Sequence, residues 1–477
     1  MSKFTVLFAT QSLMHDESIK AELNPVAAEL YSTSQWISNT VIDSRDTIDG
    51  SLFIAFSGAK VDGHDYISVA KDLGASLVLV ERFVDVDIAQ IKVSSSQLAL
   101  ACLAKAYRHS WNNTKVVALT GSAGKTSTKD MLAYCLSLIA PTQSTKGNLN
   151  NELGLPLTLL NTDIETRFLV AEMGAAELGD IRYLMGIATP DVALITNIGD
   201  AHIGRFGSVE TIANTKTEIF QCLKEGAVAV LNADDAYYEL FQERSQHVRS
   251  VTYSYTNNVA DVYFSSDVSS GENKIQISNQ LVTANLPFSS KHQKMNFISA
   301  VACLSALNVD VNVAESIASY KNVSAHRQIA ITLSNGIEII DDTYNSNPAA
   351  MKVAIDYAAS VGKNNRRLIV VFGAMAELGK FSEPKHIEVT QYAIAAGVEV
   401  FIFCGKESDV AYQYCLKNGI EAFYSENADS VAQQVLASMQ ASDVVLIKGS
   451  RSLHLDKTVD ILLKNEESIL GGHSACC

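Results

Sequence analysis

A loop of small residues between a strand and a helix carries the clearest chemistry in the sequence. The β-branched run Val116–Leu119 leads into this loop, and Lys125 and Thr126 open the helix that follows. Backbone N–H groups of such a loop can approach phosphate oxygens, and the helix start adds a partial positive charge. Lys125 can reach the β and γ phosphates of a nucleotide, and Thr126 offers a hydroxyl to Mg²⁺. The predicted triphosphate site consists of Gly121, Ser122, Ala123, Gly124, Lys125, Thr126 and Ser127.

The loop is shorter than the general phosphate-loop pattern. That pattern has a glycine five positions before the Gly-Lys pair, where this chain has Leu119. A strand, turn and helix without a ligand is therefore the alternative interpretation.

Two further strand ends carry groups that suit a metal ion. The predicted strand Phe168–Met173 ends near Glu172, and the strand Val192–Thr196 leads into a loop that carries His202. The carboxyl edge of an open α/β sheet is where ligands gather, so both side chains are candidate metal ligands. A solvated strand-end carboxylate and a structural histidine are the alternatives.

Lys216 lies on the apolar face of a predicted helix, four residues after Ile212. Burial disfavours the charged form of an amine, and a neutral amine can react with carbon dioxide to give an anionic carbamate suited to a metal centre. The alternative is that Lys216 reaches solvent or pairs with Glu172 or Glu210.

Three polar loops could contact a substrate. The segment 146–151 contains Asn148, which could orient a phosphate or carbonyl group, although Asn and Gly are also common in turns. The segment 339–348 is a strand followed by a polar loop with Asp342, Tyr344, Asn345 and Asn347. The segment 448–452 contains Lys448 and Arg451, and an arginine can bind both oxygens of a carboxylate.

Length and pattern predict an α/β protein with three domains. A chain of 477 residues is long enough for about three domains of typical size. Short strand-like runs such as 51–56 and 76–80 indicate a small α/β unit over residues 1–95, and the helical pattern 97–108 leads into the phosphate loop. Strand signals at 168–173, 192–196 and 227–231 alternate with helix signals in residues 96–323, as in a parallel sheet covered on both faces. Residues 324–477 have buried-strand candidates at 367–372, 400–404 and 444–447, which indicate a second open α/β sheet.

Charge and cysteine content narrow the class of protein. The formal net charge of -15 argues against a nucleic-acid partner. The 8 cysteines form no CxxC pair, and no export signal or long apolar run is present, so we expect reduced thiols, a cytoplasmic location and no membrane insertion. The terminal pair Cys476 and Cys477 lacks the polybasic segment that would favour a lipid anchor.

Taken together and in order, the segments TGSAGKTSTK, KGNLNN, AEMGA, TNIGDAH, ANTKTEIF, IDDTYNSNP and KGSRS resemble the Mur ligases. The resemblance extends from about Asp43 to Arg451, and this family has the shorter TGxxGKT loop. The match is closest to the branch that adds D-alanyl-D-alanine to UDP-N-acetylmuramoyl-tripeptide. The chain departs from the branch's GDMxELG segment at Ala374.

The resemblance implies three domains and a role for each group already noted. The N-terminal domain would bind the UDP part of the substrate, with Ser44 and Arg45 as contacts; the central domain would be the ATPase, and the C-terminal domain would be Rossmann-like. Lys125, His202 and Lys216 are then catalytic, and Thr126, Glu172, His202 and carbamylated Lys216 hold two Mg²⁺ ions. The resemblance also assigns Asn296 to adenine, Arg327 to the terminal phosphate and Asp342 to ribose.

The implied activity is an ATP-dependent amide ligation through an acyl phosphate, by a monomer. The substrates would be ATP, UDP-N-acetylmuramoyl-tripeptide and D-alanyl-D-alanine, and the product the UDP-linked pentapeptide of peptidoglycan synthesis. A sister Mur or folylpolyglutamate-type ligase that adds a single amino acid is one alternative. A non-enzymatic protein that uses ATP as a switch is the other.

Overall fold

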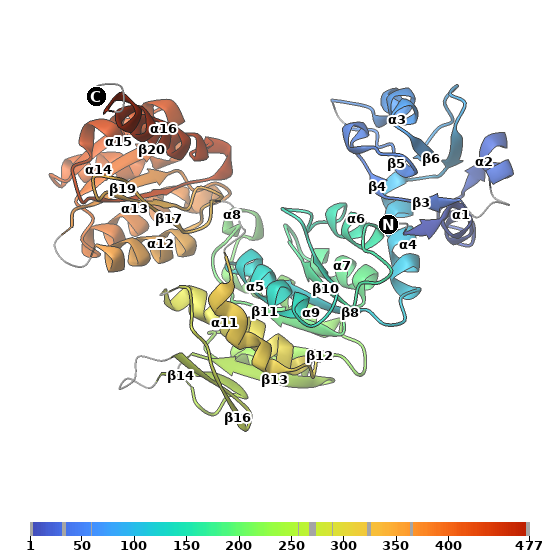
Figure 1. Ribbon diagram of the computed structural model, residues 1–477, viewed down its shortest axis with the longest axis horizontal. Coiled ribbons are helices and arrows are strands. Elements are labelled where there is room, and N and C mark those ends of the chain that lie inside the picture. Colours follow the sequence, from blue (N-terminus) through green and yellow to red (C-terminus); the bar gives the residue numbers. More distant parts are fainter. Residues whose placement is uncertain are drawn as a thin grey trace.

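The computed structural model describes residues 3–30, 35–58, 60–255, 257–266, 273–288, 290–321, 326–362 and 366–473, with the backbone alone at 265–266 and 466–473. Three sheets of five, nine and six strands define three lobes, called here the first, central and third lobes (Figure 1). Cys476 and Cys477 lie outside the described residues.

The first lobe contains the five-stranded sheet, with strand order β2-β7-β6-β5-β4. Strands β4 to β7 run parallel, and β2 pairs with β7 in the antiparallel sense. A small antiparallel pair, β1 and β3, lies beside it. The strands are β1 (Phe4–Thr5), β2 (Glu22–Leu23), β3 (Trp36–Ile37), β4 (Thr40–Val41), β5 (Ser51–Ile54), β6 (Ala75–Val80) and β7 (Ala89–Lys92). The helices are α1 (Val6–Met14), α2 (Pro25–Leu30), α3 (Ile67–Asp72) and the 3-10 turns η1 (Ser44–Asp46) and η2 (Gly63–Tyr66).

Helix α4 (Ser96–His109) connects the first lobe to the central lobe. Ser95 caps its start by accepting the N–H of Leu98, which satisfies one of the N–H groups that a helix leaves unpaired. One continuous apolar core joins α1 and α4 to α7 and the adjacent face of the central sheet. The first and central lobes therefore share buried surface.

The central sheet has the strand order β16-β15-β14-β13-β12-β11-β8-β10-β9. Helices α5 and α11 cover one face and α7 and α9 the other, which is the covering that the alternating sequence predicted. The strands are β8 (Lys115–Thr120), β9 (Thr142–Ser144), β10 (Phe168–Glu172), β11 (Val192–Ile195), β12 (Val228–Asn232), β13 (Arg249–Ser254), β14 (Val262–Ser266), β15 (Asn273–Ile277) and β16 (Gln280–Thr283). The helices are α5 (Lys125–Ser137), α6 (Gly154–Leu160), α7 (Asp180–Ala188), α8 (Ile203–Phe206), α9 (Val209–Gln221), α10 (Tyr238–Ser245), α11 (Lys291–Ala306) and η3 (Val311–Ser319).

Part of the central sheet differs from the parallel arrangement predicted. Strands β9 to β14 pair in parallel, but β14, β15 and β16 form an antiparallel meander at the edge. Ile275 and Ile277 are buried while Gln276 between them is not. This alternation is typical of a strand with one buried face, whereas strands buried on both faces are continuously apolar.

The third lobe contains the six-stranded sheet, with the order β17-β18-β22-β19-β20-β21. Its strands are parallel except for β17 against β18. The strands are β17 (Ile329–Thr332), β18 (Glu338–Asp341), β19 (Leu368–Gly373), β20 (Val400–Cys404), β21 (Glu421–Ser425) and β22 (Val444–Lys448). The helices are α12 (Pro348–Val361), α13 (Ser382–Ala395), α14 (Asp409–Lys417), α15 (Ala428–Ser438), α16 (Asp456–His473) and the 3-10 turns η4 (Gly379–Phe381), η5 (Lys406–Ser408) and η6 (Arg451–Leu453).

Among the described residues, no helix combines the length and the apolar character needed to cross a lipid bilayer.

Candidate active site

The predicted phosphate loop lies between β8 and α5 and is fixed by contacts to the neighbouring strand end. Gly124 has a φ of 78°, a left-handed conformation that favours glycine. Asn197, which follows β11, accepts the N–H of Ala123 through its side-chain oxygen at 3.0 Å and that of Ser122 through its carbonyl oxygen at 3.0 Å. The loop is therefore fixed by side-chain and backbone groups from β11.

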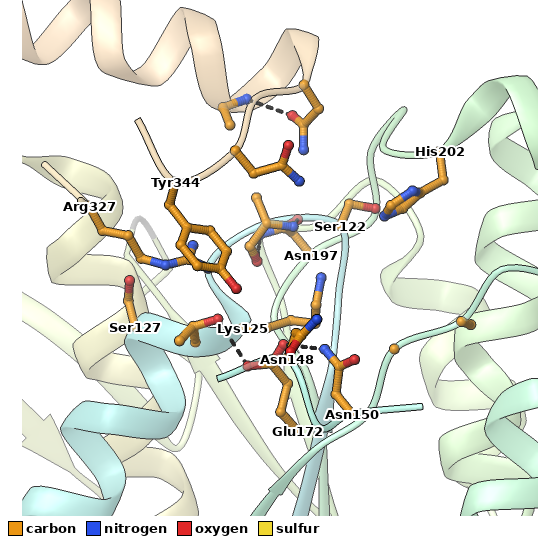
Figure 2. A pocket seen from close by; sticks show the side chains of 18 of the residues that line it. Ser122, Lys125, Ser127, Asn148, Asn150, Glu172, Asn197, His202, Arg327 and Tyr344 are labelled. Atoms are coloured by element: carbon orange, nitrogen blue, oxygen red, sulfur yellow. Dashed lines mark hydrogen bonds between the residues drawn. The ribbon is translucent and has the colours of Figure 1, made fainter. Parts of the chain in front are cut away.

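Glu172 lies at the end of β10, directly beside the first turn of α5. The Thr126 hydroxyl donates to Oε2 of Glu172 at 2.9 Å, and Nδ2 of Asn150 donates to Oε1 at 2.8 Å. Figure 2 shows both bonds and the Lys125 side chain close to this carboxylate. Since both carboxylate oxygens are engaged, the position of Glu172 is set by α5 on one side and by the 146–151 loop on the other.

Two lysines and a histidine supply the basic groups of the site. Burial lowers the pKa of Lys125, and nearby Glu172 opposes this shift. Burial, with a smaller contribution from the charge of Lys125, lowers the pKa of Lys216 well below its usual value. Burial also lowers the pKa of His202, although Glu377 opposes it. Burial thus disfavours the charged form of all three groups, and a bound ligand that carries negative charge would favour it.

Lys216 lies on α9 and is 2% exposed. Its Nζ makes no hydrogen bond or ion pair with any residue that the structure describes, and the side chain faces the cavity described below. The alternative in which Lys216 reaches bulk solvent is therefore wrong, while an electrostatic attraction to Glu172 is present.

The third lobe contributes an arginine and a buried ion pair. The Arg327 guanidinium carbon lies 4.1 Å from the centroid of the Tyr344 ring, a cation–π contact. Nζ of Lys448 binds Oδ2 of Asp342 at 2.7 Å and the carbonyl oxygen of Asn345 at 2.8 Å. Burial raises the pKa of Asp342, which the Lys448 charge opposes. Asn347 accepts the Ala350 N–H at 2.8 Å and so caps α12, with Pro348 as its first residue.

One cavity of about 680 Å³ collects these groups from the central and third lobes. Figure 2 shows Arg327 and Tyr344 on one side of it, facing Lys125 and Ser127. The predicted site residues that line it are Ser122, Ala123, Gly124, Lys125, Thr126, Ser127, Asn148, Glu172, His202, Lys216, Asn296, Arg327, Asp342, Tyr344, Asn345, Asn347, Lys448 and Arg451.

The donors at the base of this cavity fit a magnesium ion. Magnesium prefers oxygen ligands and is usually held in proteins by one or two carboxylates together with substrate phosphates. Thr126 and Glu172 present a hydroxyl and a carboxylate oxygen 2.9 Å apart beside the phosphate loop. Among the described residues no group of three or more His, Cys, Asp and Glu side chains could hold a metal alone. Phosphate oxygens would therefore have to complete the coordination.

The chain is similar in sequence to known proteins over most of its length. Residues 37–108 match the Mur ligase family catalytic domain, residues 119–304 the Mur ligase middle domain, and residues 326–451 the Mur ligase glutamate ligase domain. The UDP-N-acetylmuramoyl-tripeptide--D-alanyl-D-alanine ligase of Escherichia coli (strain K12) is 33% identical over 444 residues, which cover 92% of this chain and 96% of that protein. The chain belongs to the Mur ligase family. The resemblance inferred from the sequence motifs is thus confirmed.

Solved structures extend the match of this Mur ligase to the whole fold. MurF from Acinetobacter baumannii superposes with a TM-score of 0.84 at 28% identity, covering 97% of this chain and 99% of that one. MurF from Thermotoga maritima in complex with ADP gives a TM-score of 0.77 at 30% identity, with 90% and 98% covered. The predicted α/β fold class is confirmed.

Three residues predicted for the site of this Mur ligase do not line the cavity. Gly121 accepts a 2.7 Å hydrogen bond from Nζ of Lys125 through its carbonyl oxygen, so its backbone holds the lysine side chain within the loop. Ser44 and Arg45 belong to η1 in the first lobe; Ser44 is buried, and Arg45 is 85% exposed and paired with Asp43 at 2.6 Å. A role for Ser44 and Arg45 requires a substrate long enough to extend beyond the cavity.

Several polar residues of the Mur ligase cavity were not assigned a role from the sequence. They include Tyr183, Asn197, Arg205, His292 and Gln293. Asn197 could have been found, because it directly follows a buried strand at the same sheet edge as Glu172. His292, Gln293 and Asn296 share one face of α11 through helical spacing, but nothing in the sequence indicates which face points to the phosphate loop.

Proposed function

We propose that the chain is an ATP-dependent ligase that joins D-alanyl-D-alanine to UDP-N-acetylmuramoyl-tripeptide. One observation carries the proposal: the phosphate loop of the central lobe and the polar loops of the third lobe line the same cavity. The names of the relatives supply the identity of the substrates, since several are ligases of this tripeptide and dipeptide. The ADP complex of the relative from Thermotoga maritima supports the use of ATP.

The proposed placement of ATP follows the cavity from α5 to the third lobe. The phosphates lie on the loop 121–127, with Lys125 beside the terminal phosphates. Asn296 on α11 is placed at the adenine, and Asp342 and Arg327 of the third lobe at the ribose and the terminal phosphate. Asn296 and Gly124 are already in close approach, because a Cβ at Gly124 would overlap the Asn296 side-chain oxygen.

The proposed reaction has two steps. A carboxylate oxygen of the tripeptide attacks the γ phosphorus of ATP, and the bond from that phosphorus to the β–γ bridging oxygen breaks. ADP departs with the bridging oxygen, and the tripeptide becomes an acyl phosphate. The amine of the dipeptide then attacks the acyl carbon, phosphate departs with the C–O bond electrons, and the amine loses a proton to form the amide. The charge that develops on the transferred group faces Lys125, Arg327 and the backbone N–H groups of the loop.

A metal and a modified lysine complete the proposal. Mg²⁺ held by Thr126 and Glu172 would neutralise charge on the phosphate oxygens, and a second ion would be held by His202 and Lys216. For Lys216 we propose the carbamate, formed when the neutral amine adds to carbon dioxide and loses a proton. Its support is the buried Nζ without a hydrogen bond to any described residue and the lowered pKa.

We also propose that the domains span residues 1–95, 96–323 and 324–477. The protein would be a monomer located in the cytoplasm. Ser44 and Arg45 are proposed as contacts of the UDP group, and Asn148, Tyr344, Asn345, Asn347, Lys448 and Arg451 as contacts of the two peptides.

The test is a coupled assay with purified protein, Mg²⁺, ATP, UDP-N-acetylmuramoyl-tripeptide and D-alanyl-D-alanine. The expected result is phosphate release that requires both co-substrates and a product whose mass equals their sum less one water. Replacement of the dipeptide by D-alanine or glutamate distinguishes a sister ligase. Phosphate release that does not depend on either co-substrate would refute the proposal, and so would the absence of any phosphate release.

A further inference from the structure

The segment around α8 joins the central lobe to the third lobe by both apolar and polar contacts. In Figure 1 α8 projects from the central lobe to the edge of the third lobe. Ile203 and Phe206 of α8 are buried in the apolar core of the third lobe, together with Met375 and Leu378. The α8 helix is therefore packed as part of the opposite lobe, although the chain connects it to the central sheet.

A single side chain of the third lobe binds this segment by polar contacts. Glu377 lies in the loop between β19 and η4, and its carboxylate binds Nδ1 of His202 and, at 2.9 Å, the guanidinium of Arg205. Its carbonyl oxygen accepts the N–H of Gly204 at 3.0 Å. Among the described residues, every side-chain hydrogen bond or ion pair of Glu377 goes to this segment and none to its own lobe.

The backbone on both sides is shaped for this contact. His202 and Glu377 have φ values of 62° and 64°, a left-handed conformation that is uncommon for residues other than glycine. Gly204 leaves no room for a side chain, since a Cβ there would overlap the backbone of Glu377, Leu378 and Gly379. A second ion pair, Lys385 to Asp200 at 3.1 Å, bridges the same two lobes.

The contact also decides which nitrogen of His202 is available to the site. A carboxylate only accepts hydrogen bonds, so its bond to Nδ1 places a ring proton there, and in the neutral ring the lone pair is then on Nε2. His202 lines the cavity, and its ring in Figure 2 points from the α8 side toward Ser122. A histidine held in this way has one ring orientation and one tautomer.

We infer that Glu377 is a positioning residue: it closes a clasp between the third lobe and the α8 segment, and thereby orients His202 only when the lobes meet. The clasp consists of Glu377 with His202, Gly204 and Arg205. Docking of the third lobe and assembly of the His202 side of the cavity are then one event. The expected effect of the clasp on turnover rests on the proposed function, whereas its expected effect on the docking of the third lobe does not.

Two variants break the clasp by different means. Glu377→Gln keeps the size of the side chain and removes the charge that pairs with Arg205 and holds the proton on Nδ1. Gly204→Ala removes no polar group, but its methyl group keeps the lobes apart. The matched controls are Glu383→Ala, an exposed carboxylate in the same lobe, and Gly186→Ala, a helical glycine of α7 with open space around it.

Small-angle scattering with Mg²⁺ and a non-hydrolysable ATP analogue tests the clasp directly. Both clasp variants are expected to have a larger radius of gyration than the wild-type protein and the controls under the same conditions. Identical scattering curves for wild type and both variants, with and without the analogue, would overturn the proposal whatever reaction the protein catalyses.

Kinetics test the coupling to His202. Each clasp variant is expected to lower kcat about tenfold with the KM for ATP changed less than about threefold, and the double variant to be no slower than the slower single variant, as expected for residues that act together. Multiplied effects in the double variant, or an unchanged kcat, would contradict a shared clasp. An inactive wild-type protein would instead refute the proposed function, and the scattering result would still stand.

Discussion

The hydroxyl of Thr126 donates a 2.9 Å hydrogen bond to Oε2 of Glu172, which joins the first turn of α5 to the end of β10. Asn150 holds the other carboxylate oxygen at 2.8 Å. Two oxygen donors are therefore fixed beside the phosphate loop before any ligand arrives. Such preorganisation lowers the cost of binding a metal with a nucleotide.

We predict that Glu172→Gln raises the Mg²⁺ concentration needed for half-maximal ATP binding by about tenfold or more, because a charged ligand is replaced by a neutral amide. Fluorescence titration of a labelled ATP analogue at varied Mg²⁺ measures this. Glu177→Gln, an exposed carboxylate nearby, is the control. An unchanged Mg²⁺ requirement would remove Glu172 from the metal site.

Lys125→Ala should lower turnover by at least about a hundredfold, a typical cost for the loss of one contact to developing charge. The measurement is the steady-state rate of phosphate release with both co-substrates. Lys115→Ala removes an exposed lysine at the opposite end of β8 and should leave the rate unchanged. Near-normal turnover of Lys125→Ala would refute the assignment.

Lys216→Ala should abolish most activity, with partial recovery on addition of short carboxylic acids that can occupy the place of the carbamate. Burial lowers the pKa of Lys216 well below its usual value, which increases the share of its neutral amine, the form that adds carbon dioxide. With ¹³C-labelled bicarbonate, a carbamate resonance is expected in the wild-type protein and in the control Lys224→Ala, but not in Lys216→Ala. Its absence from the wild-type spectrum would exclude the modification.

Gly124→Ala should weaken nucleotide binding at least about tenfold. A residue with a Cβ at a φ of 78° is strained by roughly 1–2 kcal/mol, and the new methyl group would overlap the side-chain oxygen of Asn296. Gly226→Ala has a similar φ of 85° but open space around it, so it should be strained without affecting binding. Equal affinities in the two variants would show that Asn296 does not approach the nucleotide.

His386 should make the stability of the third lobe depend on pH. Its Nε2 accepts the Met375 N–H at 3.0 Å and its Nδ1 binds the Ser382 carbonyl oxygen at 2.7 Å, so the buried ring is neutral. Burial lowers its pKa in the folded state, and the stabilisation is therefore complete above the unfolded value of about 6.5 and is lost as the pH falls through the lower folded value.

His386→Leu leaves the Met375 N–H without its acceptor and should lower the free energy of unfolding by about 1–3 kcal/mol at pH 8. The difference in the free energy of unfolding between wild type and variant should decrease below the unfolded pKa of histidine, since only the wild-type protein has a buried ring whose protonation favours unfolding. Denaturant unfolding at a series of pH values measures both effects, with His247→Leu as the exposed control. A gap that is constant with pH would contradict the prediction.

Local features of the site could be predicted because neighbouring residues encode them. The strand before Gly121 and the helix from Lys125 follow from apolar periodicity and small loop residues. Helical spacing also placed Lys216 on the face of Ile212, although it left open whether the amine is buried or reaches solvent. The antiparallel pairing of β14, β15 and β16 was not predicted, because the sequence analysis expected a parallel sheet throughout this domain.

The sequence by itself indicated an α/β protein of three domains and the small-residue loop between a strand and a helix, because hydrophobic period and turn chemistry act over short distances along the chain. Only the tertiary structure decided that Arg327 and Tyr344 face Lys125 across one cavity and that His202 binds Glu377, 175 residues away in sequence. Such contacts depend on how separately formed lobes pack, and no pattern within either segment specifies that packing.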